Sequence, residues 1–235
     1  MKEKVSSFYK DATDVIDTGL RKYMLSVFSY MSVGLALTAL IAYFVSLSQE
    51  FMMVLSNPVV FSIIAFAPVI IPIYLTAKLS NISVEKARTL FLVYAASLGL
   101  SLSSIFNVYS GVSIVSTFFV TSSMFLSMVV YGYVTEKDLT RMGSFLIMSL
   151  IGLIIASIIN LFVYSSTFAF VISVIGVIVF TGLTAYDTQI IKSYYFDSDI
   201  EEVSEKKAIF GALRLYLDFI NLFLYILRFT GSRKR

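Results

Sequence analysis

Long apolar runs that carry few charges alternate with short polar segments along most of this chain. An apolar run of about 18 or more residues predicts a helix that crosses a membrane. Such runs cover about residues 23–47, 51–77, 89–107, 112–134, 142–164, 168 to between 187 and 193, and 208–229. The pattern predicts an all-α integral membrane protein, with an N-terminal segment 1–22, one seven-helix transmembrane domain 23–229 and a basic tail 230–235.

Proline interrupts only the second of these predicted helices. Pro58 lies near its start, whereas Pro68 and Pro72 lie inside it. A proline inside a helix lacks the N–H that the preceding turn would accept, and its ring crowds that turn. We therefore expect the second helix to bend or break at Pro68 and Pro72.

The charges of the connecting segments orient the bundle, because Lys and Arg are enriched in cytoplasmic loops. The basic residues gather before the first helix and after helices two, four and six, at Lys2, Lys4, Lys10, Arg21, Lys22, Lys78, Lys86, Arg88, Lys137, Arg141, Lys192, Lys206 and Lys207. The alternate loops have no Lys or Arg. The N-terminus is therefore predicted to be cytoplasmic. The last helix has basic residues at both ends, so it either spans with its tail outside or re-enters; its length favours spanning.

Two of the predicted helices carry small residues at four-residue spacing. Such stripes let helix backbones approach closely in a membrane. The stripes are Ala95, Gly99 and Ser103 in the third helix, and Gly152, Ala156 and Asn160 in the fifth. We interpret both as helix-packing faces rather than ligand sites.

The composition excludes several classes of function. Hydrophobic residues make up 58% of the chain and charged residues 14%, and the mean hydropathy is +0.87. Because the chain has no Cys and no His, disulfides, thiol nucleophiles, zinc sites built on Cys or His, and Ser–His catalysis are excluded. A nucleic-acid binder is not expected, and no cofactor is indicated. Proton chemistry would have to use Asp, Glu, Lys, Arg or Tyr.

Two carboxylates lie within the predicted membrane helices. Asp187 is near the cytoplasmic end of the sixth helix, and Asp218 is ten residues into the seventh. A charge at membrane depth is costly and usually faces the bundle interior, at a pathway or a proton site. Asp218 also belongs to a polar face that recurs at three- and four-residue steps, made of Gly211, Arg214, Asp218, Asn221, Tyr225 and Arg228. We expect Asp187 and Asp218 to lie close enough to share a proton.

Each carboxylate also has a simpler interpretation. Asp218 could form a local ion pair with Arg214, four residues earlier on the same face. Asp187 could be a solvated carboxylate at the membrane interface. Neither alternative prevents the two carboxylates from meeting.

Gly182–Gln189, with the sequence GLTAYDTQ, resembles the hallmark of the Bax inhibitor-1 family, also called the transmembrane BAX inhibitor motif family. Gly19–Met24 is similar to the entry to that family's first helix, and Gly99–Phe106 to its third helix. Leu215–Phe223 is similar to the last helix, and Tyr131–Leu139 to the bacterial branch of the family. The matches run over nearly the whole chain in the family's order.

This resemblance implies six helices around a central seventh and a pH-sensitive calcium leak. The aspartates that sense protons would be Asp187 and Asp218, which would also be weak, transient ligands of the passing calcium ion. The family's basic latch near the second helix would correspond to Lys78 or Arg88, with Arg214 as a further ion-pair partner. Residues expected to line the pore are Thr184, Asn221 and Tyr225. The expected surroundings are the lipid bilayer of a bacterial inner membrane, and a membrane protease is a possible partner.

Two other functions compete with a leak channel. A non-conducting regulator that binds a membrane protease or another membrane protein would leave cell calcium unchanged when deleted. An intramembrane aspartyl protease also places two aspartates on neighbouring helices, where they could activate water. However, Asp218 follows Tyr216 and Leu217 instead of the Gly-x-Gly of such proteases, and their Pro-Ala-Leu motif is absent. We therefore do not expect an enzyme.

Overall fold

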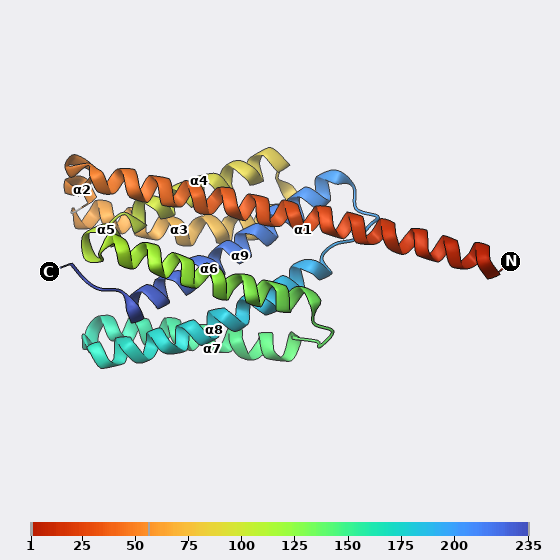
Figure 1. Ribbon diagram of the computed structural model, residues 1–235. Coiled ribbons are helices and arrows are strands. Elements are labelled where there is room, and N and C mark those ends of the chain that lie inside the picture. Colours follow the sequence, from red (N-terminus) through yellow and green to blue (C-terminus); the bar gives the residue numbers. More distant parts are fainter. Residues whose placement is uncertain (1, 56, 235) are drawn as a thin grey trace.

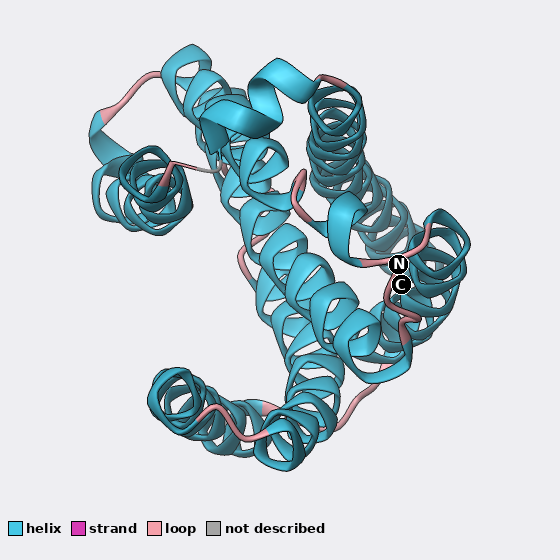
Figure 2. Ribbon diagram, turned by 90° about the vertical axis from the view of Figure 1, so that its left-hand side faces the viewer, coloured by secondary structure: helices cyan, strands magenta, loops and turns pink. Residues whose placement is uncertain are grey.

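The computed structural model describes residues 2–55 and 57–234, without the side chains at 2–17, 58, 61–63, 65–69 and 80. In this part of the chain, helices are joined by short connections, and the one β-type contact is a single bridge between Tyr109 and Arg233 (Figure 2). The elements are α1 (Lys2–Leu47), α2 (Gln49–Leu55), α3 (Pro58–Lys78), η1 (Leu79–Asn81), α4 (Val84–Leu102), α5 (Ile105–Val108), α6 (Gly111–Val134), α7 (Thr140–Val163), α8 (Ser166–Ser193) and α9 (Glu201–Thr230).

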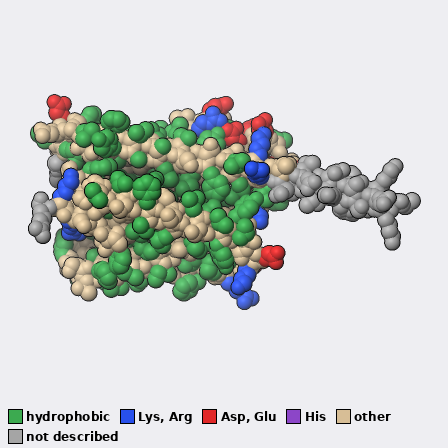
Figure 3. Space-filling model, viewed as in Figure 1, with side chains coloured by type: hydrophobic (Ala, Val, Ile, Leu, Met, Phe, Trp, Pro, Cys, Tyr) green, Lys and Arg blue, Asp and Glu red, His purple; other side chains and the backbone are tan. Residues whose placement is uncertain are grey.

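Six segments within the described residues are long and apolar enough to cross a membrane. They are Thr18–Leu47, Val84–Val108, Gly111–Val134, Thr140–Val163, Ser166–Ser193 and Glu201–Thr230. The expected second crossing falls on α2 and α3, where many side chains lie outside the description, so the seventh crossing stays a prediction. On the face seen in Figure 3, apolar side chains predominate between two ends that carry the charged side chains. The chain is therefore an all-α, multi-pass membrane protein.

The second predicted helix divides at Pro58 and not at the later prolines. Asn57 caps α3, and its side-chain oxygen accepts the N–H groups of Val59 at 3.0 Å and Val60 at 3.4 Å. Proline is favourable at this first helical position, where its missing N–H has no partner to lose. Of the expected bend or break at Pro68 and Pro72, the break is wrong, because α3 continues through both to Lys78, and the bend stays a prediction. Membrane helices tolerate such prolines when nearby groups satisfy the freed carbonyls.

Helix α9 forms the centre of the bundle and packs against α1, α4, α6 and α8 (Figure 1). Its apolar residues reach full burial, as at Leu215, Tyr216 and Leu222. Helix α3 packs chiefly on α4, and α7 on α8. Because α9 is central, the polar face that it carries lies against other helices instead of lipid.

The two ends of the chain lie at opposite ends of the molecule (Figure 1). The C-terminal tail pairs with the corner between α5 and α6. The N–H of Lys234 donates to the carbonyl of Val108 at 2.9 Å, and the N–H of Ser110 donates to the carbonyl of Ser232 at 3.1 Å. This arrangement supports the alternative in which the last helix spans and its basic tail lies outside. The other end, which carries the basic loops, is called the cytoplasmic end below.

The two small-residue stripes behave differently. Ala95, Gly99 and Ser103 are all buried, and a Cβ on Gly99 would lie 2.8 Å from the carbonyl oxygen of Thr38 in α1. The packing interpretation is confirmed there. It is wrong for Gly152, which is exposed and has nothing within 4 Å of the position of a Cβ. Spacing alone does not show which face of a helix meets a neighbour.

Gly132 of α6 offers a test of close packing, because a Cβ there would strike the backbone carbonyl of Ala185 in α8. Backbone cannot rotate away as a side chain can, so Gly132→Ala should reduce the free energy of unfolding by about 1–3 kcal/mol. The matched variant Gly152→Ala should not reduce the free energy of unfolding and can increase it, because alanine has the higher helix propensity. Unfolding of both variants in detergent micelles measures the difference, and equal effects would contradict this packing.

Candidate functional site

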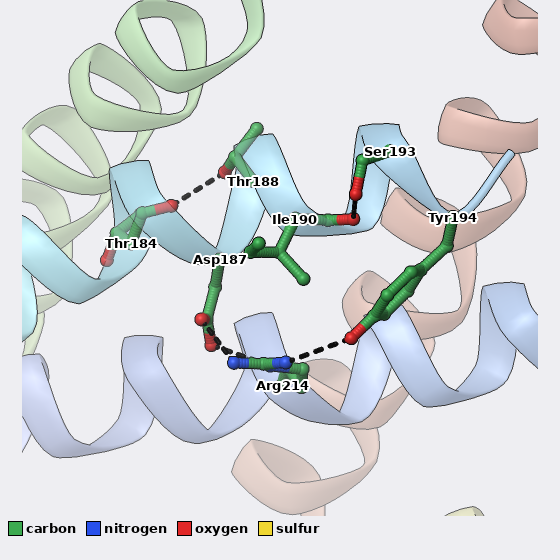
Figure 4. Close-up of polar contacts among 7 residues, drawn as sticks. All are labelled: Thr184, Asp187, Thr188, Ile190, Ser193, Tyr194 and Arg214. Carbon is green, nitrogen blue, oxygen red and sulfur yellow. Dashed lines mark hydrogen bonds and ion pairs between the residues drawn. The ribbon is translucent and has the colours of Figure 1, made fainter. Parts of the chain in front are cut away.

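Asp187 lies about two turns before the end of α8 and is buried, with 6% of its surface exposed. Its neighbours on the helix satisfy their own hydroxyl groups. Thr184 donates to the carbonyl of Phe180 at 2.8 Å, and Thr188 donates to the carbonyl of Thr184 at 2.7 Å (Figure 4). These bonds return to the same helix and leave the Asp187 carboxylate to be satisfied from another helix.

Arg214 of α9 supplies that partner. Its Nε donates to Asp187 Oδ2 at 2.9 Å and its Nη2 donates to Asp187 Oδ1 at 2.6 Å, so the pair is bidentate (Figure 4). A third donor, Nη1, reaches the hydroxyl of Tyr194 at 3.5 Å. The Asp187 side chain is 8% exposed and that of Arg214 is 26% exposed. Paired, charge-assisted bonds of this kind are strong and fix the geometry of both partners. They connect α8 to the central helix.

Asp218 lies one turn after Arg214 on α9 and is 4% exposed. Its Oδ2 is buried and has no hydrogen-bond partner among the described residues. The charged groups that act on it are Asp187 and Arg214. The structure thus brings the two predicted aspartates and Arg214 into one electrostatic unit, here called the Asp–Arg–Asp site.

The alternative interpretation of Asp218, a local ion pair with Arg214, is wrong, because Arg214 pairs with Asp187 on α8. Side chains on a helix lean toward its N-terminus. Arg214 therefore points away from Asp218 and toward the end of α8. The interpretation of Asp187 as a solvated interface carboxylate is also wrong, since the residue is buried.

The two other latch candidates lie elsewhere. Lys78 is exposed at the cytoplasmic end of α3. Arg88 of α4 pairs with Glu205 at the start of α9, and its Nε donates to the hydroxyl of Tyr30 in α1 at 3.1 Å. Tyr30 also donates to Glu205. This cluster ties three helices together at the cytoplasmic end, separately from Asp187.

The three residues expected to line the pore are engaged in packing or in bonds to their own helix. Thr184 is fully buried, and the Asn221 amide donates to the carbonyl of Leu217 at 2.8 Å. The ring of Tyr225 stacks on Phe180, with 5.7 Å between the centroids. Their role in a pore stays a prediction. In the described part of the chain, no three acidic side chains converge into a group that could hold a metal ion.

Two polar contacts of the central helix could not be predicted from the sequence, one at the Asp–Arg–Asp site and one in a separate network. The sequence does not single out Tyr194 as a partner of Arg214, because aromatic residues at helix ends usually anchor the membrane interface. A second buried bond pairs the hydroxyls of Tyr216 and Thr38 at 2.6 Å, and Thr38 also donates to the carbonyl of Ala95 at 2.8 Å. That network links α9, α1 and α4. Spacing could not have found it, because its members come from distant parts of the chain.

Known proteins resemble this chain over nearly its whole length. The family model described as inhibitor of apoptosis-promoting Bax1 matches residues 20–235. An uncharacterised protein of Rickettsia prowazekii is 49% identical over 219 residues, which cover 93% of this chain and 92% of that protein. The inner membrane protein YbhL of Escherichia coli is 45% identical over 219 residues, covering 92% and 94%.

These similarities agree with the predicted resemblance in extent, because they cover the residues that carry its motifs. The relatives are bacterial, and one of them is an inner membrane protein by name. The chain is therefore a multi-pass membrane protein that belongs to the Bax inhibitor-1 family.

Proposed function

We propose that this protein is a pH-sensitive calcium-leak channel of the bacterial inner membrane, with seven crossings of which the last is central. The observation that supports it is the Asp–Arg–Asp site. A bidentate ion pair joins α8 to the central helix, and Asp218 is buried near it, with an Oδ2 that has no hydrogen-bond partner among the described residues. Calcium is the cargo in this proposal and not a resident ion.

The gate in this proposal is the pair between Asp187 and Arg214. The pair holds α8 against α9 only while Asp187 is ionised, because a neutral carboxyl loses the attraction to the guanidinium. A proton taken up by the site first removes the repulsion between Asp187 and Asp218, and further protonation releases Arg214. Acidification should therefore loosen the contact between α8 and α9 and increase the leak. Because both aspartates are buried, each change of charge on them is energetically large.

The same geometry argues against catalysis. An aspartyl protease needs two carboxylates that share a proton and activate water between them. Here both oxygens of Asp187 are engaged by Arg214. We therefore propose that the aspartates sense protons and do not cleave a substrate.

Calcium flux in liposomes tests the function directly. Purified protein in vesicles with an entrapped calcium dye should pass calcium faster as the pH falls from 8 to 5. The variant Asp187→Asn should flatten this pH profile, because its side chain has no proton to take up in that range. Asp197→Asn, at an exposed aspartate in the loop before α9, is the matched control and should behave as the wild type. Protein that passes no calcium at any of these pH values would favour a non-conducting regulator.

A further inference from the structure

A groove lies between α3 and α9. Its volume is about 560 Å³, within the ~300–1,000 Å³ typical of ligand pockets. The walls are almost entirely apolar, with Pro72 and Ile73 on α3 and Leu213 and Leu217 on α9. The groove exists because α3 packs on α4 and leaves part of the central helix uncovered.

Among the described residues that line this groove, one is charged, and it is Arg214. Arg214 is the accessible half of its ion pair, since 26% of its side chain is exposed against 8% for Asp187. A guanidinium has five N–H donors, and among the described residues Asp187 and Tyr194 accept three of them. Arg214 can therefore bind a further acceptor from the groove without releasing Asp187.

The groove also extends to the cytoplasmic end of α3. Thr76 and Ala77, one or two residues before the exposed Lys78 at the cytoplasmic end of α3, line the groove together with Arg214. Pro72 and Ile73, about one turn farther from that end of α3, also line the groove, as does Leu217 of α9. The groove thus has one cation in its lining, Arg214, while Lys78 follows the last lining residue of α3 and the residues farther from the cytoplasmic end are apolar. Basic pockets between membrane helices on the cytoplasmic side bind anionic headgroups.

We infer that the groove between α3 and α9 is a binding site for an anionic phospholipid of the cytoplasmic leaflet. The phosphate would accept hydrogen bonds from Arg214, with Lys78 beside the mouth, and one acyl chain would lie along Ile73 and Leu217. Bound lipid would fill the space between α3 and the central helix. This inference does not require the protein to conduct calcium.

Tryptophan fluorescence tests the inference, because the chain has no native Trp. The reporter is Ile73→Trp in the groove, and Phe145→Trp, exposed on α7, is the control. Each position lies five residues from the cytoplasmic end of its helix, at Lys78 and Thr140. In vesicles, phosphatidylglycerol with brominated chains should quench the Ile73→Trp reporter with an apparent affinity about fivefold higher than brominated phosphatidylcholine. The control should show no preference.

Two further variants locate the preference. In the reporter background, Arg214→Gln should abolish it by removing the charge. Thr76→Phe should abolish it by filling the groove while the ion pair stays intact, so a folding defect of Arg214→Gln does not decide the result. The inference is overturned if the Ile73→Trp reporter shows no preference for phosphatidylglycerol over phosphatidylcholine, or if that preference survives Thr76→Phe. It is also overturned if a brominated fatty acid displaces the phospholipid. Because none of these readouts is a flux, failure here is distinguishable from failure of the proposed leak.

Discussion

Arg214→Gln should destabilise the protein by about 3–5 kcal/mol and open the leak at pH 8. The variant leaves Asp187 as a buried carboxylate without its bidentate partner, and removing one partner of a buried pair carries a cost of that size. The same change cuts the connection between α8 and the central helix. Unfolding in detergent micelles measures the stability, and calcium flux at pH 8 measures the opening.

Two controls separate this effect from a general loss of charge. Arg88→Gln removes an arginine whose side chain is 47% exposed and paired with Glu205, so its cost should stay below about 1 kcal/mol. The double variant Asp187→Asn with Arg214→Gln leaves no buried charge in the pair and should recover at least half of the stability lost. If the double variant is as unstable as Arg214→Gln, the ion pair is not the source of the effect.

The bundle could be predicted from the sequence because its main signal is local. Apolar runs and loop charges gave the order and orientation of the helices, and the polar face of residues 211–228 predicted that the last helix is enclosed. The division at Pro58 was missed because the apolar pattern continues across it. It depends on a cap, in which the side chain of Asn57 accepts two N–H groups at the start of α3.

The candidate site was predicted in part. An acidic residue is rare within an apolar membrane helix, so Asp187 and Asp218 could be identified from the sequence. Their partner could not be assigned, because helical spacing placed Arg214 next to Asp218. Which carboxylate an arginine reaches depends on the lean of its side chain and on the neighbouring helix, and neither is visible in spacing. The groove between α3 and α9 was equally hidden, since it arises from how far apart two helices pack.

Asp218→Asn should have the opposite effect on stability from Arg214→Gln. At pH 8 an ionised Asp218 would have a buried oxygen without a donor and a second carboxylate nearby. Asparagine has nearly the same shape and no charge, so the variant should be more stable than the wild type by about 1–3 kcal/mol at that pH. At pH 5 the gain should disappear, because asparagine then replaces a carboxyl that already carries a proton.

The calcium flux of Asp218→Asn should change in parallel. Without the second carboxylate, the site takes up one proton fewer on acidification, so the pH profile of the leak should flatten while Arg214 still holds Asp187. The exposed Asp197→Asn serves again as the control, with stability and flux equal to the wild type at both pH values. A stability gain of equal size at pH 5 and pH 8 would show that Asp218 keeps one protonation state across this range. The proton would then have to act at Asp187 alone, and Arg214 would be the only group that reports its charge to the central helix.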